Sequence, residues 1–145
     1  MPERQVDKVY VDGKPCSDHK CEDEVNDDNF YCYKAECYAT TRIIADKLGI
    51  PKDKYTVCFQ SRLDKKWLTP FSDVVVKEQA KKGAKKLLVF SPAFVADCLE
   101  TVIEIGSEYQ QIFKENGGEK VQLVESLNDH PMWIEALKNL ILKQA

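Results

Sequence analysis

The 145-residue chain has the composition of one globular domain, with 43% hydrophobic and 31% charged residues, and its length allows a sizeable core. A net charge of −3 argues against nucleic-acid binding, which favours a basic face. No apolar run is long enough to span a membrane, and we find no signal peptide before Pro2. We therefore expect a cytoplasmic protein whose six cysteines are thiols or metal ligands and not disulfides.

The composition changes near residue 30, which divides the chain into two parts. Residues 1–29 are polar and acidic, contain Gly13 and Pro15, and include two cysteines. We expect this segment to be irregular or partly disordered, apart from a short strand at residues 9–11. Residues 30–145 are expected to form an α/β domain.

Helices and strands alternate along this second part. Helices are predicted at residues 31–48, 72–82, 94–115 and from 131 onward. Apolar and β-branched runs predict strands at residues 55–59, 87–90 and 121–124, and the middle one is apolar enough to be buried on both faces. This order predicts a three-layer α/β/α fold around a parallel sheet of at least three strands. Functional sites in such folds lie in the loops that follow the strands.

Carboxylates recur on one side of the helix predicted at residues 94–115. Steps of three and four place them on one stripe; they are Asp97, Glu100, Glu104 and Glu108. The opposite side is expected to face the core through Leu99, Val102, Ile103, Ile112 and Phe113. Spacing alone favours a solvated acidic face near a helix start. The other interpretation is a site where a cation or shared protons compensate the repulsion.

Four cysteines are spaced as two equal pairs, Cys16-x4-Cys21 and Cys32-x4-Cys37. Such a pattern is compatible with zinc or a [2Fe–2S] cluster, although the x4 gaps are at the wide end of zinc spacing. Residues five apart do not share a helix face, so Cys32 or Cys37 must precede the regular helix. Four unrelated thiols remain the alternative.

Several short sequence words occur in a distinctive order. They are Phe59–Arg62, Trp67–Pro70, Phe94–Thr101, Glu125–Asn128 and Trp133. In this order they resemble the carboxy-terminal half of the ferrochelatases, lyases of haem biosynthesis that insert ferrous iron into protoporphyrin IX. The resemblance covers roughly residues 31–143 and the segment Pro2–Arg4, and implies the chelatase-like α/β/α fold.

The resemblance implies roles for the acidic helix. Glu100 corresponds to the active-site glutamate that accepts a pyrrole proton or transiently binds iron, and Glu104 to a second acidic position that relays protons or metal. Asp97 is either a helix cap or a direct participant. Cys98 replaces a histidine of related proteins, so we assign it no proton transfer and expect a small buried side chain.

The resemblance also implies substrate contacts. Trp67, Leu68 and Pro70 correspond to residues that line the porphyrin mouth, although Trp67 alone would be read as a core aromatic. Phe94 is expected to form a wall of the slot. Arg62 is expected to pair with a porphyrin propionate or within an internal salt bridge.

Some ferrochelatases carry a [2Fe–2S] cluster, so the resemblance favours this cluster over zinc on Cys16, Cys21, Cys32 and Cys37. In the family, a segment like Pro2–Arg4 directly follows a Ser-aromatic-His-Gly word that supplies the catalytic histidine. We therefore expect the chain to be a half-site, inactive without the amino-terminal domain. The alternatives are a non-catalytic iron–sulfur or zinc redox module, or a chelatase for another tetrapyrrole.

Overall fold

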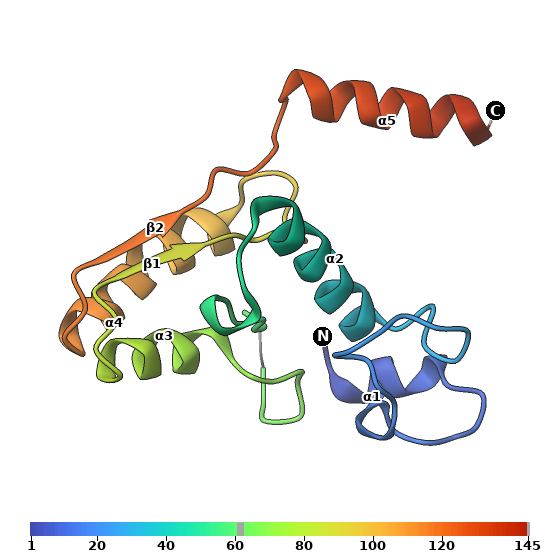
Figure 1. Cartoon of the computed structure of the whole chain (residues 1–145), viewed down its shortest axis with the longest axis horizontal. Coiled ribbons are helices and arrows are strands. Elements are labelled where there is room, and N and C mark those ends of the chain that lie inside the picture. The colour runs from blue at the N-terminus through green and yellow to red at the C-terminus, as the bar shows by residue number, and fades with distance from the viewer. Residues whose placement is uncertain (61–62, 145) are drawn as a thin grey trace. The chain divides into compact units, whose positions relative to one another are not determined.

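The computed structural model describes residues 1–60 and 63–144 and consists of two compact units (Figure 1). The first unit is Met1–Val75 and the second is Val76–Ala145. Helix α3, Ser72–Lys81, contains the division between them.

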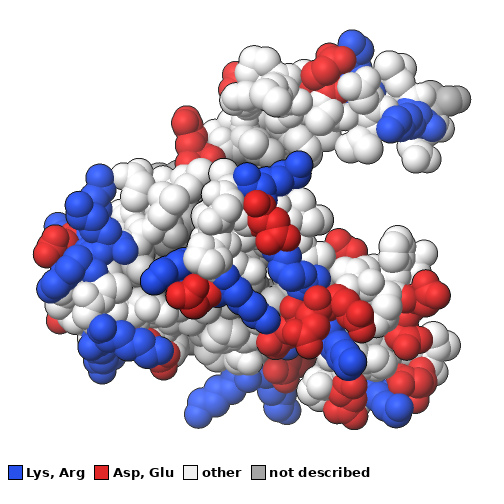
Figure 2. Space-filling model, viewed as in Figure 1, with Lys and Arg blue, Asp and Glu red and all other residues white. Residues whose placement is uncertain are grey.

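The first unit is built from α1, Glu3–Val6, α2, Tyr33–Leu48, and short 3₁₀ turns. Helix α2 ends as predicted, because Gly49 adopts φ 65° and its N–H bonds the last turn of the helix. Acidic side chains crowd over the amino-terminal segment (Figure 2). The buried residues of this unit form one cluster, comprising Val6, Tyr10, Cys16, Cys21, Cys32, Ala35, Phe59 and Leu68.

Two strands that the sequence predicts in this unit do not form. Residues 9–11 do not form a strand, because Asp7–Val9 is a 3₁₀ helix and the Val11 side chain is fully exposed. The β-branched run at 55–59 makes a single bridge, Phe59 with Phe71. A strand needs a continuous hydrogen-bonded neighbour to satisfy its backbone groups, and the described part of this unit does not provide one.

The second unit contains a parallel two-stranded sheet. Strand β1, Lys86–Val89, pairs with β2, Lys120–Leu123, so that Lys86 lies beside Lys120 and Val89 beside Leu123. The crossover between them consists of a π-helix, Glu100–Glu108, that continues into α4, Tyr109–Glu115. The mixed helix and strand content and the parallel pairing confirm the α/β character of the chain.

One face of this sheet packs on the helices. Leu87, Val89 and Leu123 contact a buried core that includes Val121 and Phe113. Successive side chains of a strand point to opposite faces, and Leu88 on the other face of β1 is 70% exposed. The prediction that the strand at 87–90 is buried on both faces is therefore wrong for this unit.

The crossover helix buries only part of the stripe that was predicted. Its buried residues are spaced four apart: Thr101, Ile105, Tyr109 and Phe113. Phe113 and the half-buried Ile112 lie in the core as predicted, whereas Leu99, Val102 and Ile103 were expected there but are exposed. The reason is the wider π-helical turn, in which the Tyr109 N–H bonds the carbonyl of Glu104, five residues back. A pattern counted at 3.6 residues per turn therefore selects the wrong core residues at the π-helical end of the segment.

Helix α5, Pro131–Gln144, follows an extended connection after β2 (Figure 1). It forms where the sequence predicts a final helix, with Pro131 in its first turn. Leu140, Ile141 and Leu142 near its end are all more than half exposed. Among the helices described for the chain, none combines the length and the apolar character needed to cross a membrane.

Candidate functional site

Three buried thiols meet in the first unit. The Sγ atom of Cys16 lies 3.6 Å from that of Cys21 and 3.7 Å from that of Cys32, and all three sulfurs lie within 4.8 Å of one another. We call these residues the thiol cluster. Tetrahedral thiolate coordination at 2.3 Å spaces sulfur atoms about 3.8 Å apart, so the arrangement fits three ligands of one metal ion.

Backbone and amide hydrogen bonds fix the loops that carry the thiol cluster. The Cys16 N–H donates to Asp7 Oδ1 at 2.8 Å. Cys32 is the N-cap of α2, and its N–H donates to the Asn29 carbonyl at 2.8 Å. Asn29 is fully buried, and its Nδ2 donates to the Glu24 carbonyl at 3.0 Å. The sulfurs therefore come together because irregular loops, and not a regular helix, present two of them.

The thiol cluster surrounds the hydroxyl of Tyr10. Tyr10 Oη lies 2.8 Å from Cys21 Sγ and 3.5 Å from Cys16 Sγ, and its ring stacks on His19 with 3.8 Å between ring centroids. Neither ring was predicted to contact the cysteines. In the sequence, Tyr10 and His19 merely lie on either side of Cys16. Such a placement is too common to predict a contact.

The thiols of the cluster differ in their pKa values. Burial raises the pKa of Cys16 to about 12, and burial also raises that of Cys21. For Cys32, burial is outweighed by hydrogen bonds from Tyr10 and from the Ala35 N–H, which lower the pKa. Cys32 is therefore the thiol of the cluster whose thiolate form the surroundings favour.

Cys37 lies apart from this group. Within residues 1–60 and 63–144, the sulfurs that lie within 4.8 Å of one another are those of the thiol cluster, without Cys37. Cys37 is on α2, five residues after Cys32, and its half-buried thiol interacts with the Tyr33 side chain. Burial raises the pKa of Cys37.

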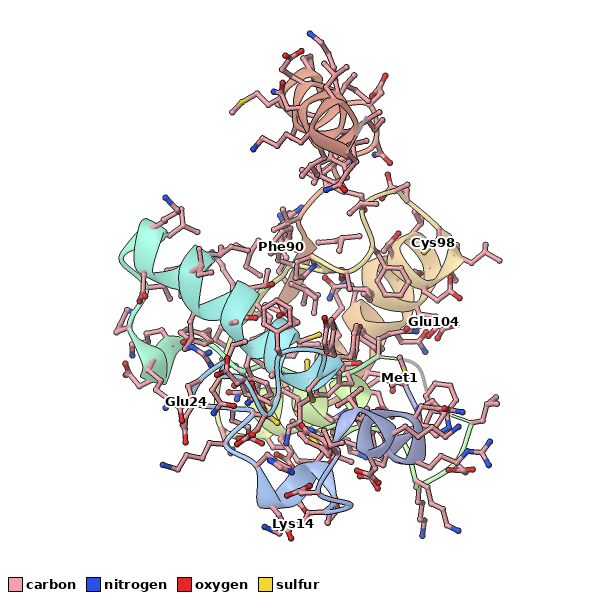
Figure 3. The ribbon with its side chains drawn as sticks, turned by 90° about the vertical axis from the view of Figure 1, so that its right-hand side faces the viewer. Met1, Lys14, Glu24, Phe90, Cys98 and Glu104 are labelled. Carbon is pink, nitrogen blue, oxygen red and sulfur yellow. The ribbon has the colours of Figure 1, made fainter. Side chains whose placement is uncertain are left out.

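The acidic residues lie along the crossover helix of the second unit. Glu100 and Glu104 are half-buried, whereas Asp97 and Glu108 are exposed. Cys98 precedes the helix and Glu104 lies further along the same segment (Figure 3). The predicted stripe thus divides into two partly shielded carboxylates and two solvated ones. The shielded pair are the two glutamates that the resemblance singled out.

Asp97 links the loops that follow β1 and β2. Its N–H donates to Asn128 Oδ1 at 2.9 Å, and Asn128 Nδ2 donates back to Asp97 Oδ2 at 2.9 Å. Hydrogen bonds from Asn128 and Ser126 lower the pKa of Asp97. Thr101 Oγ1 accepts the Cys98 N–H at 3.0 Å at the start of the helix. The Asp97–Asn128 pair thus joins the segments at the carboxyl ends of both strands.

Replacing Asn128 by Ala should raise the pKa of Asp97 toward 3.8 and lower the melting temperature by a few degrees. The Asp97 pKa is lower in the folded than in the unfolded chain, so the contribution of this carboxylate to the free energy of unfolding is complete above pH 3.8. This contribution disappears as the pH falls through the folded value. The stability difference between wild type and variant should therefore be largest at neutral pH and fall in strong acid to the part that comes from the lost Asp97 N–H bond to Asn128 Oδ1.

Carboxyl NMR titration and thermal unfolding between pH 2 and 7 provide the measurement. Asn139→Ala is the matched control, because Asn139 is exposed on α5. An unchanged Asp97 pKa in Asn128→Ala would contradict the paired geometry.

The residues predicted to contact a porphyrin fall in both units. In the first unit, Trp67 is half-buried, Leu68 is 4% exposed and Pro70 is exposed. The Leu68 side chain is therefore part of the core, and Trp67 pairs with Pro2 through an antiparallel bridge. Phe94 is half-buried in the second unit, and Arg62 lies outside the described residues.

Comparison with known proteins places the whole chain in one family. The family model "Ferrochelatase" matches residues 7–145. The chain is 43% identical over 150 residues to the ferrochelatase of Pseudomonas putida (strain W619) and 42% identical over 143 residues to that of Pseudomonas fluorescens (strain Pf0-1). It is 40% identical over 144 residues to that of Coxiella burnetii (strain Dugway 5J108-111).

These alignments cover 97–99% of the chain but only 41–43% of each relative. The chain therefore spans about two fifths of the length of the curated relatives that it matches. The family match and the ordered sequence words agree, and the chain belongs to the ferrochelatase family.

Proposed function

We propose that this chain is the carboxy-terminal part of an enzyme that inserts ferrous iron into protoporphyrin IX to form protohaem, a lyase of haem biosynthesis. The observation that carries the proposal is the half-buried pair Glu100 and Glu104 on a π-helix that follows strand β1. π-helical turns occur often at functional sites, and parallel sheets place sites beyond the carboxyl ends of their strands. Family membership supplies the substrate class.

Iron insertion exchanges two pyrrole protons of the porphyrin for one ferrous ion, so the reaction needs two proton acceptors. In the proposal, the Glu100 carboxylate accepts a pyrrole proton, and Glu104, one helical step away, passes a proton to solvent or an iron ion inward. Carboxylates suit this task because they bind ferrous iron weakly enough to release it, whereas a closed thiolate site would retain it. Partial burial of both side chains strengthens their electrostatic effect at the macrocycle.

The porphyrin contacts are proposed for Trp67, Pro70 and Phe94, with Arg62 as partner of a propionate. Leu68 is proposed to contribute to the same mouth from the core, where its side chain is buried. The exposed apolar side chains Leu88, Leu99 and Val102 favour a further covering layer, because large exposed apolar areas mark interaction surfaces. We propose that the amino-terminal domain provides this layer and the opposite wall of the slot. The intact protein would then have three strands or more in three layers.

We further propose a [2Fe–2S] cluster, or alternatively zinc, on Cys16, Cys21 and Cys32, with Cys37 as the fourth ligand. Thiolate sulfur is the donor that both zinc and a [2Fe–2S] cluster take, and the mutual spacing of the three buried thiols is that of ligands to one metal ion. When bound, a [2Fe–2S] cluster supplies one-electron chemistry, whereas zinc supplies a structural link. In this arrangement residues 1–29 carry part of the metal site and residues 30–145 form the chelatase domain.

The thiol cluster also favours a second candidate function, a non-catalytic metal or redox module that the α/β part supports. Both functions fit the cytoplasm, where six free thiols stay reduced. A third possibility is metallation of a different tetrapyrrole.

The test is a substrate screen with the intact parent protein under anaerobic conditions. Ferrous iron is offered with protoporphyrin IX, uroporphyrin or sirohydrochlorin, and metallation is followed by absorption. Selective formation of protohaem is the expected result. Preference for sirohydrochlorin would reassign the substrate, and a metal chromophore without metallation of any porphyrin would establish the redox module instead.

A further inference from the structure

Tyr10 brings a phenol hydroxyl into a cluster of sulfur atoms. The side chain is only 6% exposed, and its oxygen lies closest to Cys21 Sγ, at 2.8 Å. The amide of Asn29 lies further from the same sulfur, at 3.9 Å. Cys21 itself is 1% exposed. Water therefore has little access to this sulfur, and its polar contacts must come from the protein.

The tyrosine is held in this position from several sides. Its ring stacks face to face on His19, with 10° between the ring planes. Its N–H donates to the Asp7 carbonyl at 3.3 Å, and the Asp7 carboxylate in turn accepts the Cys16 N–H at 2.8 Å. Asp7 therefore couples the backbone position of Tyr10 to that of Cys16. A hydroxyl fixed in this way loses little conformational entropy when it forms a hydrogen bond.

The direction of the hydrogen bond depends on the state of the sulfur. Between two neutral groups, either the phenol or the thiol can donate. A sulfur bound to a metal is a thiolate and has no proton to give. The phenol, which keeps its proton at neutral pH, then becomes the donor, and hydrogen bonds to an ionised acceptor are the stronger ones.

We propose that Tyr10 is a positioning residue of the metal site: its hydroxyl donates a hydrogen bond to the metal-bound sulfur of Cys21, orients that ligand and withdraws electron density from it. The inference rests on the metal site proposed for the thiol cluster. Partners of this kind orient metal ligands, and their loss typically reduces metal affinity 10–100-fold. Hydrogen bonds to ligand sulfur atoms also set the reduction potential of an iron–sulfur cluster.

Cobalt(II) alone serves as the probe, added to the full chain after metal removal under anaerobic, reducing conditions. The sulfur-to-cobalt charge-transfer bands report on the electron density of the ligand sulfurs, and the d–d bands report on coordination geometry. Tyr10→Phe keeps the aromatic ring and removes only the hydroxyl. We expect its charge-transfer bands to move to lower energy, with the d–d pattern retained and cobalt affinity reduced about 10-fold or more. Tyr31→Phe is the matched control, because Tyr31 is 81% exposed.

The outcomes separate this inference from the proposal on which it rests. A wild-type chain without thiolate-to-cobalt bands would overturn the metal site and the role of Tyr10 together. A wild-type chain with these bands, and a Tyr10→Phe variant with the same band energies and affinity, would overturn the role of Tyr10 alone. A new phenolate-to-metal band in the wild type would make Tyr10 a ligand and contradict its role as donor.

A second measurement needs no variant and covers the case in which Tyr10→Phe fails to fold, as judged by circular dichroism. Cobalt–sulfur stretching bands of the wild-type protein are recorded in H₂O and in D₂O. A donated hydrogen bond to Cys21 predicts that one of these bands shifts when the hydroxyl is deuterated. Identical bands in the two solvents would overturn the proposal.

Discussion

Replacing Glu100 by Gln in the intact parent enzyme should reduce kcat for iron insertion by about 100-fold or more, the range expected when a general base is removed. Glutamine has nearly the same size and can still contact the macrocycle, but its amide neither accepts a pyrrole proton at neutral pH nor carries a negative charge for ferrous iron. The KM for protoporphyrin should change little, because the loss concerns the proton transfer and not the apolar contacts.

Initial rates of anaerobic haem formation measure this effect, with Glu115→Gln as the control. Glu115 is exposed on α4 and accepts a hydrogen bond from Gln111 at 2.9 Å, so its replacement should leave turnover unchanged. Near-normal turnover in Glu100→Gln would remove Glu100 from the catalytic role.

Replacing Cys21 by Ser should abolish stable metal binding by the chain. The substitution removes one of three converging sulfurs, and a serine hydroxyl is a poor ligand for metals that prefer thiolates. The two thiols that remain, Cys16 and Cys32, are too few to enclose a metal ion. Protein is prepared without oxygen, and bound iron, sulfide and zinc are determined together with the visible absorption spectrum.

Cys58→Ser is the control for this variant. Cys58 is half-buried outside the thiol cluster, and burial raises the pKa of its thiol to about 11, so it should not contribute to binding. Cys37→Ser tests the proposed fourth ligand separately. Retention of the full metal content in Cys21→Ser would show that the thiol cluster is not the binding site.

The features of the fold that could be predicted from the sequence are those that local chemistry determines. Gly49 and Gly83 end their helices with positive φ angles, because few other residues adopt this conformation cheaply. Strands β1 and β2 form within a residue or two of their predicted positions. The run at 55–59 has equal β-propensity but lacks a continuous neighbour, and pairing partners are a property of the tertiary fold.

The cysteine spacing predicted a metal site, and three of the four cysteines concerned, Cys16, Cys21 and Cys32, lie together. Spacing alone favoured a solvated acidic face on the crossover helix, and only the family resemblance singled out Glu100 and Glu104. The π-helix was not predictable, because its wider turn changes which residues face the core. Tyr10 was missed for a related reason. Its contact with Cys21 depends on irregular loops between them, which follow no periodic pattern.

In our proposal, this chain contributes one wall of an iron-insertion site and needs a second wall to act. The most direct test incubates the 145-residue chain and the intact parent protein side by side with ferrous iron and protoporphyrin IX, without oxygen. Positioning of reacting groups on both faces of the macrocycle accounts for about 7–11 kcal/mol in well-oriented systems, and one wall alone leaves the site open to water. We predict haem formation at an enzymatic rate by the parent and no rate above the uncatalysed reaction for the chain. Equal turnover by the chain alone would contradict the half-site account.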